Sequence, residues 1–441
     1  MSQITARIDR LPSTPLLKQV LFLTGIGWMF DAMDQGMVSG VMAAIVKDWG
    51  LSTEQLALLG SVGMLGMALG AALSGMAADR FGRRNVILWT LIIYGAASGL
   101  SGFANSYPML LALRFVTGFG LGGELPAAAT LISEFSPTRI RGRYVILLES
   151  FWAWGWILAA LVAYLAIPAY GWRMAFWIGA VPALFAAVLR MAIPESPRFL
   201  EQSGKHAEAE ALVRRMEEQA GLQPVQPEPG TDSTIAPAAK FSFWQLWSGD
   251  YARSTFVLWV IWFGINFGYY GFVLWTPTLL LGKGFALVKS FEFTLIMSLA
   301  QLPGYFSAAW LIERIGRKKV LSLYFAGTAL ASWLFGHAAS TAEVLLYGSL
   351  LYFFALGTWG CVYAYTPEVY PTIARGTGSG WAAAFGRIGA FTAPFVVPVI
   401  YKSYGEQSGY TMVFVLLTGV FLAVALIVAL MGRETMGKPL Q

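Results

Sequence analysis

Two aspartates near the start of this sequence lie among residues that are almost all apolar. Asp31 and Asp34 lie three residues apart, which places them on one face of a helix. An ionised side chain inside a membrane-spanning helix costs about 2.5–3.5 kcal/mol on insertion scales, so such residues usually have a function. Removal from water disfavours the charged form of a carboxyl group, whereas a nearby cation favours it. Asp31 and Asp34 are therefore candidate proton carriers.

Three other charged residues, Arg114, Glu124 and Glu149, also lie inside apolar stretches. Two interpretations of the glutamates stay open. Either they carry protons, or they bind Arg141 or Arg143 in the adjoining loop and so support a gate. Both histidines lie away from the middle of any apolar stretch, so we do not expect a histidine relay.

A single arginine interrupts the small and apolar segment GWAAAFGRIGAFTAP. This residue, Arg387, has no acidic neighbour in its own segment. A cation in such a place predicts an anionic substrate, typically a carboxylate, that binds the guanidinium. The alternative is a protein carboxylate supplied by another helix.

Aromatic and polar residues recur at helical spacing in three apolar stretches. They are Trp152 and Trp156, then Asn266, Tyr269 and Tyr270, and finally Trp359 and Tyr363. Aromatic faces stack on planar ligands, and tyrosine hydroxyls add hydrogen bonds. This pattern predicts a site for a planar ligand, although tryptophans that face lipid or pack between helices are the alternative.

No residue set in the sequence indicates an enzyme. The single cysteine, Cys361, excludes an internal disulfide and a cysteine-built metal site, and two histidines are too few for a histidine-rich one. Because no nucleophile–base pair or set of metal ligands appears either, we expect no metal and no cofactor beyond a coupling proton.

The elements that position these residues follow from the composition. The chain has 441 residues, of which 57% are hydrophobic and 12% charged. A soluble domain carries roughly 25% charged residues, so this composition predicts a membrane protein. Residues 1–18 are polar and mixed, and the first apolar stretch is too long for the core of a signal peptide, so we expect no cleaved signal.

Twelve apolar stretches are each long enough for a helix of about 20 residues that spans a membrane. They cover residues 19–45, 55–78, 86–105, 107–133, 143–167, 173–193, 254–281, 290–311, 319–339, 342–367, 378–401 and 409–431. We therefore predict an all-α protein with a six-helix bundle at 1–193, a linker with helical and proline-rich parts at 194–250, and a second six-helix bundle at 251–441.

The basic residues orient these helices. Most of the 30 lysines and arginines lie in the termini, the linker and the loops on one side of the predicted membrane. By the positive-inside rule this side, with both termini, is cytoplasmic. The net charge of +6 therefore reflects membrane orientation, and we expect no nucleic-acid partner.

The charged loops repeat at a constant interval. The segment DRFGRR at 79–84 matches ERIGRK at 313–318, and SEFSPTRIRG at 133–142 matches PEVYPTIARG at 367–376. Both matches lack gaps and have the same offset, so the two halves are parallel repeats that are related by an axis along the membrane normal. The alternative, that these charges only set topology, explains their sign but not the shared offset.

These loop motifs, together with RFVTGFGLGG from Arg114 and PESPRFL at 194–200, resemble the major facilitator superfamily in its sugar-porter and organic-ion branch. The segments IWFGINFGYYGFVLWTP at 261–277 and LGGELPAAATLISEF at 121–135 resemble the synaptic vesicle glycoprotein 2 group. Among bacterial members the chain resembles the niacin permeases. The resemblance implies a transporter that exposes a binding site to alternate sides of the membrane.

The resemblance also implies a cytoplasmic gate of salt bridges that break as the gate opens. Its residues are Asp79, Arg83, Glu134, Arg143, Glu313, Arg317, Glu368 and Arg375. Exposed ion pairs contribute only about 0–1 kcal/mol each, which suits a gate that must open and close.

In sugar porters an aspartate at the position of Asp34 pairs with the arginine at the position of Arg114, and its protonation couples transport to the proton gradient. In relatives of the synaptic vesicle group, the positions of Trp152 and Trp359 line a ligand pocket. The positions of Tyr363 and Arg387 hold an aspartate and a lysine there, so the charge pattern of this chain is different and fits an aromatic anion better.

We therefore expect a proton-coupled importer of a small aromatic carboxylate, nicotinate above others, in the inner membrane of a cell and active as a monomer. The alternatives are a symporter for benzoate-like acids, an exporter, a sugar permease and a membrane receptor that does not transport. A sugar permease would carry glutamine where this chain has Trp156, and a receptor would carry a large domain outside the membrane.

Overall fold

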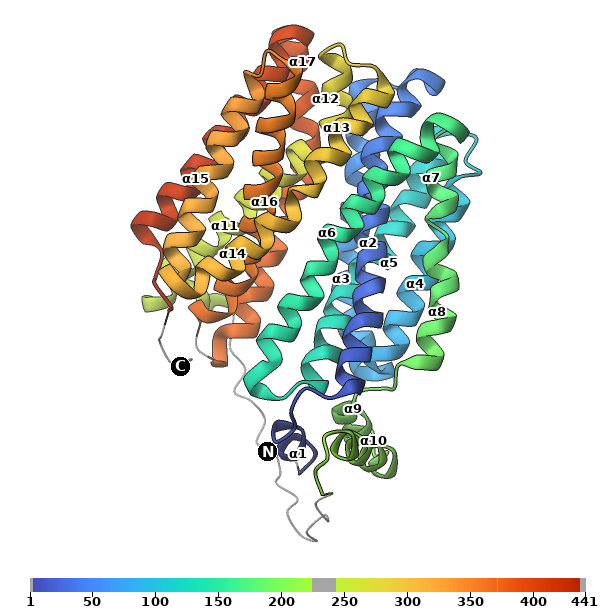
Figure 1. The fold of residues 1–441 in the computed structure, drawn as a ribbon, viewed down its shortest axis with the longest axis vertical. Coiled ribbons are helices and arrows are strands. Elements are labelled where there is room, and N and C mark those ends of the chain that lie inside the picture. The colour runs from blue at the N-terminus through green and yellow to red at the C-terminus, as the bar shows by residue number, and fades with distance from the viewer. Residues whose placement is uncertain (1–2, 224–242, 371, 437–441) are drawn as a thin grey trace. The chain divides into compact units, whose positions relative to one another are not determined.

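The computed structural model describes residues 3–223, 243–370 and 372–436, and every regular element in these ranges is a helix (Figure 1). This confirms the predicted all-α class. The first five predicted spans are single helices. They are α2 (Pro15–Trp49), α3 (Thr53–Phe81), α4 (Arg83–Ser101), α5 (Tyr107–Phe135) and α6 (Thr138–Tyr170).

Several later spans are built from two helical pieces. These are α7 (Arg173–Ile178) with α8 (Val181–Ala192), α11 (Gly249–Val273) with α12 (Thr276–Gly282), and α13 (Leu287–Leu299) with α14 (Gln301–Ile315). Proline lies in the first turn of both α8 and α12. A proline there lacks an N–H donor for the preceding turn, so a new helix begins with it.

The last four predicted spans form three helices, α15 (Arg317–Gly336), α16 (Thr341–Val369) and α17 (Thr372–Met431). Gly405 interrupts α17 with a φ of 76°, a left-handed conformation that glycine adopts readily. The two predicted spans at 378–401 and 409–431 lie on either side of this kink.

Within the described residues, nine helical segments are individually long and apolar enough to cross a membrane. The other three predicted spans, α4, the α7–α8 pair and α15, are helical but do not meet that measure of length and hydropathy. Two of them begin with the basic runs of the charged loops, which lowers their hydropathy.

The helices form two compact units. The first contains residues 1–31, 65–152 and 177–238, and the second contains residues 32–64, 153–176 and 239–441. In the second unit α17 packs against α11 and α15, and α16 packs against α14 and α15. The predicted boundaries at 193 and 251 describe the sequence repeat, and they stay a prediction.

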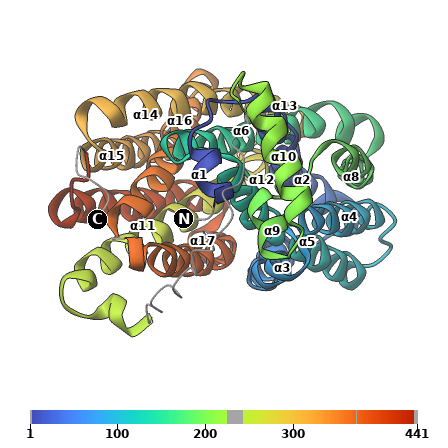
Figure 2. The same ribbon diagram turned by 90° about the horizontal axis from the view of Figure 1, so that it is seen from below.

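Three short helices pack together in the first unit, as the view from below shows (Figure 2). They are α1 (Gln3–Asp9), α9 (Pro197–Gln202) and α10 (His206–Gln219). The buried Arg7 guanidinium binds the Glu217 carboxylate through two contacts of 2.7 and 2.9 Å and also binds Glu210. Helix α10 lies in the segment predicted as a linker with helical parts, whereas the proline-rich part from residue 224 lies outside the described residues.

Candidate functional site

An aromatic cluster in the second unit joins α11 and α16. The rings of Trp359 and Tyr363 stack with centroids 5.6 Å apart, and the Trp262 ring lies edge-on to both. The Tyr269 ring meets the Trp359 ring edge-on at 6.0 Å. The Trp262 N–H donates a 3.0 Å hydrogen bond to Thr366 Oγ1, which fixes the indole. The predicted aromatic residues of these two helices therefore lie in one place.

Two tyrosines of this cluster are held by glutamines. The Tyr269 hydroxyl donates to Gln301 Oε1 at 3.5 Å, and the Tyr270 hydroxyl donates to Gln35 Oε1 at 3.3 Å. Trp156 from α6 lies edge-on to the Tyr269 ring at 5.9 Å. All five side chains are buried, so the polar groups meet each other in an environment that excludes most water.

Arg387 supplies the positive charge of this region. It is half-buried on α17, close enough to the Tyr270 hydroxyl to interact with it electrostatically. Its neighbour Gly386 lets α17 approach α11, because a side chain at 386 would meet Asn266 and the backbone of Trp262. The Asn266 amide donates a 2.8 Å hydrogen bond to the Trp262 carbonyl. A planar anion could stack on these rings and bind the guanidinium.

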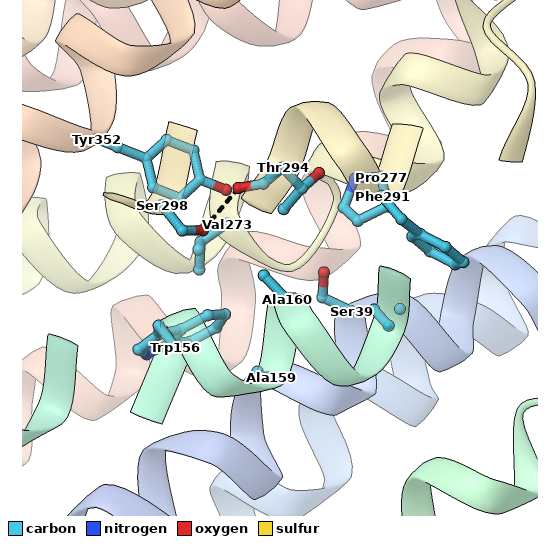
Figure 3. Close-up of a pocket in the computed structure, with 13 residues that line it drawn as sticks. Ser39, Trp156, Ala159, Ala160, Val273, Pro277, Phe291, Thr294, Ser298 and Tyr352 are labelled. Atoms are coloured by element: carbon cyan, nitrogen blue, oxygen red, sulfur yellow. Dashed lines mark hydrogen bonds between the residues drawn. The ribbon is translucent and has the colours of Figure 1, made fainter. Parts of the chain in front are cut away.

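A small cavity lies beside Trp156 in the second unit (Figure 3). It encloses about 10 Å³, which is room for about one water molecule. Ser39, Thr294, Ser298 and Tyr352 contribute hydroxyl groups to its lining. The Ser298 hydroxyl donates to the Thr294 carbonyl at 2.7 Å. The cavity is too small for an aromatic acid, and it indicates close packing at this end of the aromatic cluster.

Trp152 lies in the first unit, where its ring packs on Trp28 with centroids 4.8 Å apart. Trp359 lies in the second unit. The two tryptophans that the resemblance to the synaptic vesicle group places in a ligand pocket thus belong to different units, and their joint role stays a prediction.

The predicted proton carriers are all removed from water. Asp31, Asp34 and Glu124 are fully buried, and Arg114 and Glu149 nearly so.

In the first unit the carboxyl groups of Asp31 and Glu124 lie close enough to interact electrostatically. Gly27, one turn before Asp31, makes this approach possible, because any side chain there would displace the Glu124 carboxyl. Two buried carboxyl groups that lie close together do not both ionise, so this pair is suited to hold one proton. Asp34 and Arg114 belong to different units, and their pairing stays a prediction.

Four of the residues predicted for the gate form matching ion pairs in the two repeats. Arg83 binds Glu134 at 3.1 Å, and Arg317 binds Glu368 at 3.1 Å. Each arginine also donates to a main-chain carbonyl five residues earlier. Arg143 and Glu313 are exposed, and the side chains of Asp79 and Arg375 lie outside the described part of the structure.

Two glutamates that bind the main chain beside these ion pairs were not predicted from the sequence. Glu195 accepts hydrogen bonds from the main-chain N–H groups of Arg83 and Arg84 at 3.0 and 3.2 Å. In the other repeat Glu434 accepts one from the N–H of Arg317 at 2.9 Å. Each carboxylate thereby caps the positive end of a helix. Burial raises the pKa of Glu195, whereas the N–H donors lower it. The available signal was an acidic residue shortly after the last span of each half.

Glycine is required at both capped helix ends. Gly82 and Gly316 precede α4 and α15 with φ values of 96° and 101°, which favour glycine. A side chain at either position would also collide with the capping carboxylate of Glu195 or Glu434. These two constraints explain the glycine in both copies of the charged motif.

We expect Gly82→Ala and Gly316→Ala to lower the transport rate and the melting temperature, because each displaces a cap and strains the backbone. A matched control is Gly204→Ala, since Gly204 has a φ of 77° with open space around it. The control should show only the backbone strain, of about 1 kcal/mol. Measurement of uptake and of thermal unfolding for all three variants tests this. Equal losses in all three would mean that the carboxylate caps contribute nothing.

Comparison with known proteins gives three kinds of result. A sequence profile for the family described as "Sugar (and other) transporter" matches residues 26–441. The protein named "Niacin transporter NiaP" of Acinetobacter baylyi is 45% identical over 438 residues, which is 99% of each chain. The "Putative niacin/nicotinamide transporter NiaP" of Bacillus subtilis is 44% identical over 422 residues, which cover 95% of this chain and 96% of that one.

More distant similarities extend to animal proteins and to solved structures. The "Synaptic vesicle 2-related protein" of Bos taurus is 33% identical over 95% of this chain and 78% of its own. The structure of the xylose transporter XylE from E. coli, in a partially occluded inward-open conformation, superposes with a TM-score of 0.75. It covers 96% of this chain and all of that chain at 20% identity, so it supports the fold alone.

Proposed function

Because the chain belongs to the sugar (and other) transporter family of the major facilitator superfamily, we propose that it imports a small aromatic carboxylate, nicotinate, together with protons. The observation that carries this proposal is the aromatic cluster of Trp262, Trp359 and Tyr363 with Arg387 in the same unit. Nicotinate has the two features that such a site would bind, a planar ring and a carboxylate. The two relatives whose names include niacin support the same substrate.

Charge supplies the orientation of the substrate in this proposal. The planar guanidinium of Arg387 can meet a carboxylate with two hydrogen bonds. The aromatic rings then hold the pyridine ring by stacking, which adds about 0.5–1.5 kcal/mol per contact beyond the burial of apolar area. Asn266, Tyr269 and Tyr270 complete the site with polar groups.

Proton binding supplies the driving force. We assign it to Asp34 with Arg114 as its partner, and the Asp31–Glu124 pair is the alternative carrier. A carboxyl group that loses its charge on protonation releases its cationic partner, which lets the two sides of the membrane gain access in turn. In this proposal the protein is a monomer in the inner membrane of a cell, with both termini in the cytoplasm.

The test of the function is uptake of labelled nicotinate by proteoliposomes with an acidic exterior. We expect accumulation above the external concentration, and we expect a proton ionophore to abolish it. Absence of nicotinate uptake under a proton gradient, with another aromatic acid taken up instead, would reject the assigned substrate.

Trp359→Ala should weaken nicotinate binding about tenfold or more, because it removes the ring that stacks on Tyr363 and contacts Tyr269. Trp154→Ala is the matched control, since Trp154 is about half exposed on α6. The measurement is equilibrium binding of labelled nicotinate to purified protein. Unchanged affinity in Trp359→Ala would remove this ring from the site.

A further inference from the structure

Three N–H donors around the Tyr269 side chain are buried and have no hydrogen-bond acceptor among the described residues. They are Trp156 Nε1, Trp359 Nε1 and Gln301 Nε2. Trp156 and Trp359 both meet the Tyr269 ring edge-on, and Gln301 accepts the Tyr269 hydroxyl. The three side chains that carry these donors thus contact one tyrosine, although they come from three different helices, α6, α14 and α16.

The Gln301 amide turns its Oε1 toward the Tyr269 hydroxyl, at 3.5 Å. Because Oε1 accepts the Tyr269 hydroxyl, the Nε2 group is left as a donor. A buried donor without an acceptor costs about 1–3 kcal/mol, so buried polar groups are rarely left in this way. Several such donors in one aromatic cluster indicate the place of a ligand that accepts hydrogen bonds.

The positive charge lies next to the other tyrosine. Arg387 interacts with Tyr270, whose ring centroid is 5.5 Å from that of Tyr269. The cluster therefore has a cationic end at Tyr270, where Gln35 Nε2 is a further buried donor, and a neutral donor end at Tyr269. A carboxylate satisfies the first end. The donors near Tyr269 can be satisfied by a neutral hydrogen-bond acceptor in the ring that carries the carboxylate. A pyridine nitrogen is such an acceptor, because it accepts a hydrogen bond but cannot donate one.

We infer that Gln301 donates a hydrogen bond to the ring nitrogen of a pyridine carboxylate, so that the site selects pyridine acids over benzene acids. This inference rests on the proposed function and concerns specificity within it. Benzoate keeps the planar ring and the carboxylate but leaves the donors around Tyr269 unpaired. A site that hydrogen-bonds a polar group of its ligand discriminates strongly against an analogue without that group. The discrimination is stronger than that against an analogue that differs only slightly in apolar size.

The experiment compares binding of nicotinate, benzoate and nicotinamide to the purified full-length protein. The unaltered protein should bind nicotinate at least about tenfold more tightly than benzoate. Gln301→Leu should bring the two acids to within about threefold, chiefly through weaker nicotinate binding, while the preference for nicotinate over nicotinamide remains. Isonicotinate and picolinate, in which the nitrogen is displaced, should bind more weakly than nicotinate to the unaltered protein only.

Two variants keep this test decisive. Gln19→Leu removes an exposed glutamine on α2 and should leave every ratio unchanged. If Gln301→Leu does not yield a folded protein by size-exclusion chromatography, Gln301→Met keeps the length of the side chain and removes the donor. This variant should also lose the preference for the pyridine ring.

The outcomes separate the inference from the function on which it rests. Equal binding of nicotinate and benzoate by the unaltered protein, with acid still preferred over amide, would overturn the inference and leave the aromatic-acid transporter standing. It would mean that water satisfies the donors around Tyr269. A pyridine preference that survives in both Gln301 variants would also overturn the assignment to Gln301. Failure to bind any aromatic acid would reject the proposed function itself.

Discussion

Arg387→Ala should bind nicotinate and nicotinamide almost equally, whereas the unaltered protein should favour the acid by about 100-fold. The two ligands share the pyridine ring and differ in charge. A hydrogen bond to a charged group contributes about 1.5–3 kcal/mol, and one 1.4 kcal/mol step is a factor of ten in affinity. The half-buried position of Arg387 near Tyr270 keeps the guanidinium partly out of water, which strengthens its attraction for an anion.

Two further variants define this result. Arg387→Lys should retain part of the preference, because it keeps the charge but loses the planar fork of two donors. Lys402→Ala removes an exposed cation from the same helix and should leave the preference intact. The measurement is competition of acid and amide against labelled nicotinate. Equal binding of the two ligands by the unaltered protein would mean that a protein carboxylate neutralises Arg387.

Asp34→Asn should exchange nicotinate across the membrane but fail to accumulate it. The amide has nearly the shape of the acid but cannot bind and release a proton, so transport should lose its coupling to the gradient. The experiment measures accumulation and counterflow in the same proteoliposomes. We expect accumulation to fall to the background level while counterflow stays within a few-fold of that of the unaltered protein.

The matched control for this result is Glu54→Gln, which removes an exposed carboxylate at the start of α3 and should accumulate normally. Asp31→Asn and Glu124→Gln test the other carrier. If Asp34→Asn still concentrates nicotinate in a manner sensitive to an ionophore, the proton is carried elsewhere. The buried Asp31–Glu124 pair is then the group to examine.

Most of the fold could be predicted from the sequence, because the length of an apolar stretch is what a membrane requires. Each of the twelve stretches is helical in the described residues. The breaks were not predicted. Pro182 and Pro277 lie in the first turns of new helices, and hydropathy does not detect such breaks because both sides of them are apolar.

The site was predicted where spacing along one helix determines which residues lie together. Trp359 and Tyr363, four residues apart, stack as that spacing suggests. Gln35 and Gln301 were missed, because neither lies in one of the three stretches whose aromatic spacing predicted the site. A joint role of Trp152 and Trp359 needs residues of both units, and spacing along one helix does not determine which residues of two units meet.

The contacts in the charged loops were also predicted only in part. The repeated motif brought out Arg83, Glu134, Arg317 and Glu368, because side chains of opposite charge recur at one offset. The capping glutamates act on main-chain N–H groups, which have no signature in the sequence. They also lie outside the repeated motif, at different distances from it.

The two capping glutamates show how far each half of the repeat extends along the chain. Glu195 follows α8 and Glu434 follows α17, and each binds the N-terminus of a helix in its own half. Each half of the repeat thus includes, besides its predicted membrane spans, a short segment that returns to cap one of its helices. A chimaera that exchanges halves between two relatives should therefore be joined after residue 223. A junction directly behind α8 would separate the first half from Glu195, the glutamate that caps one of its helices.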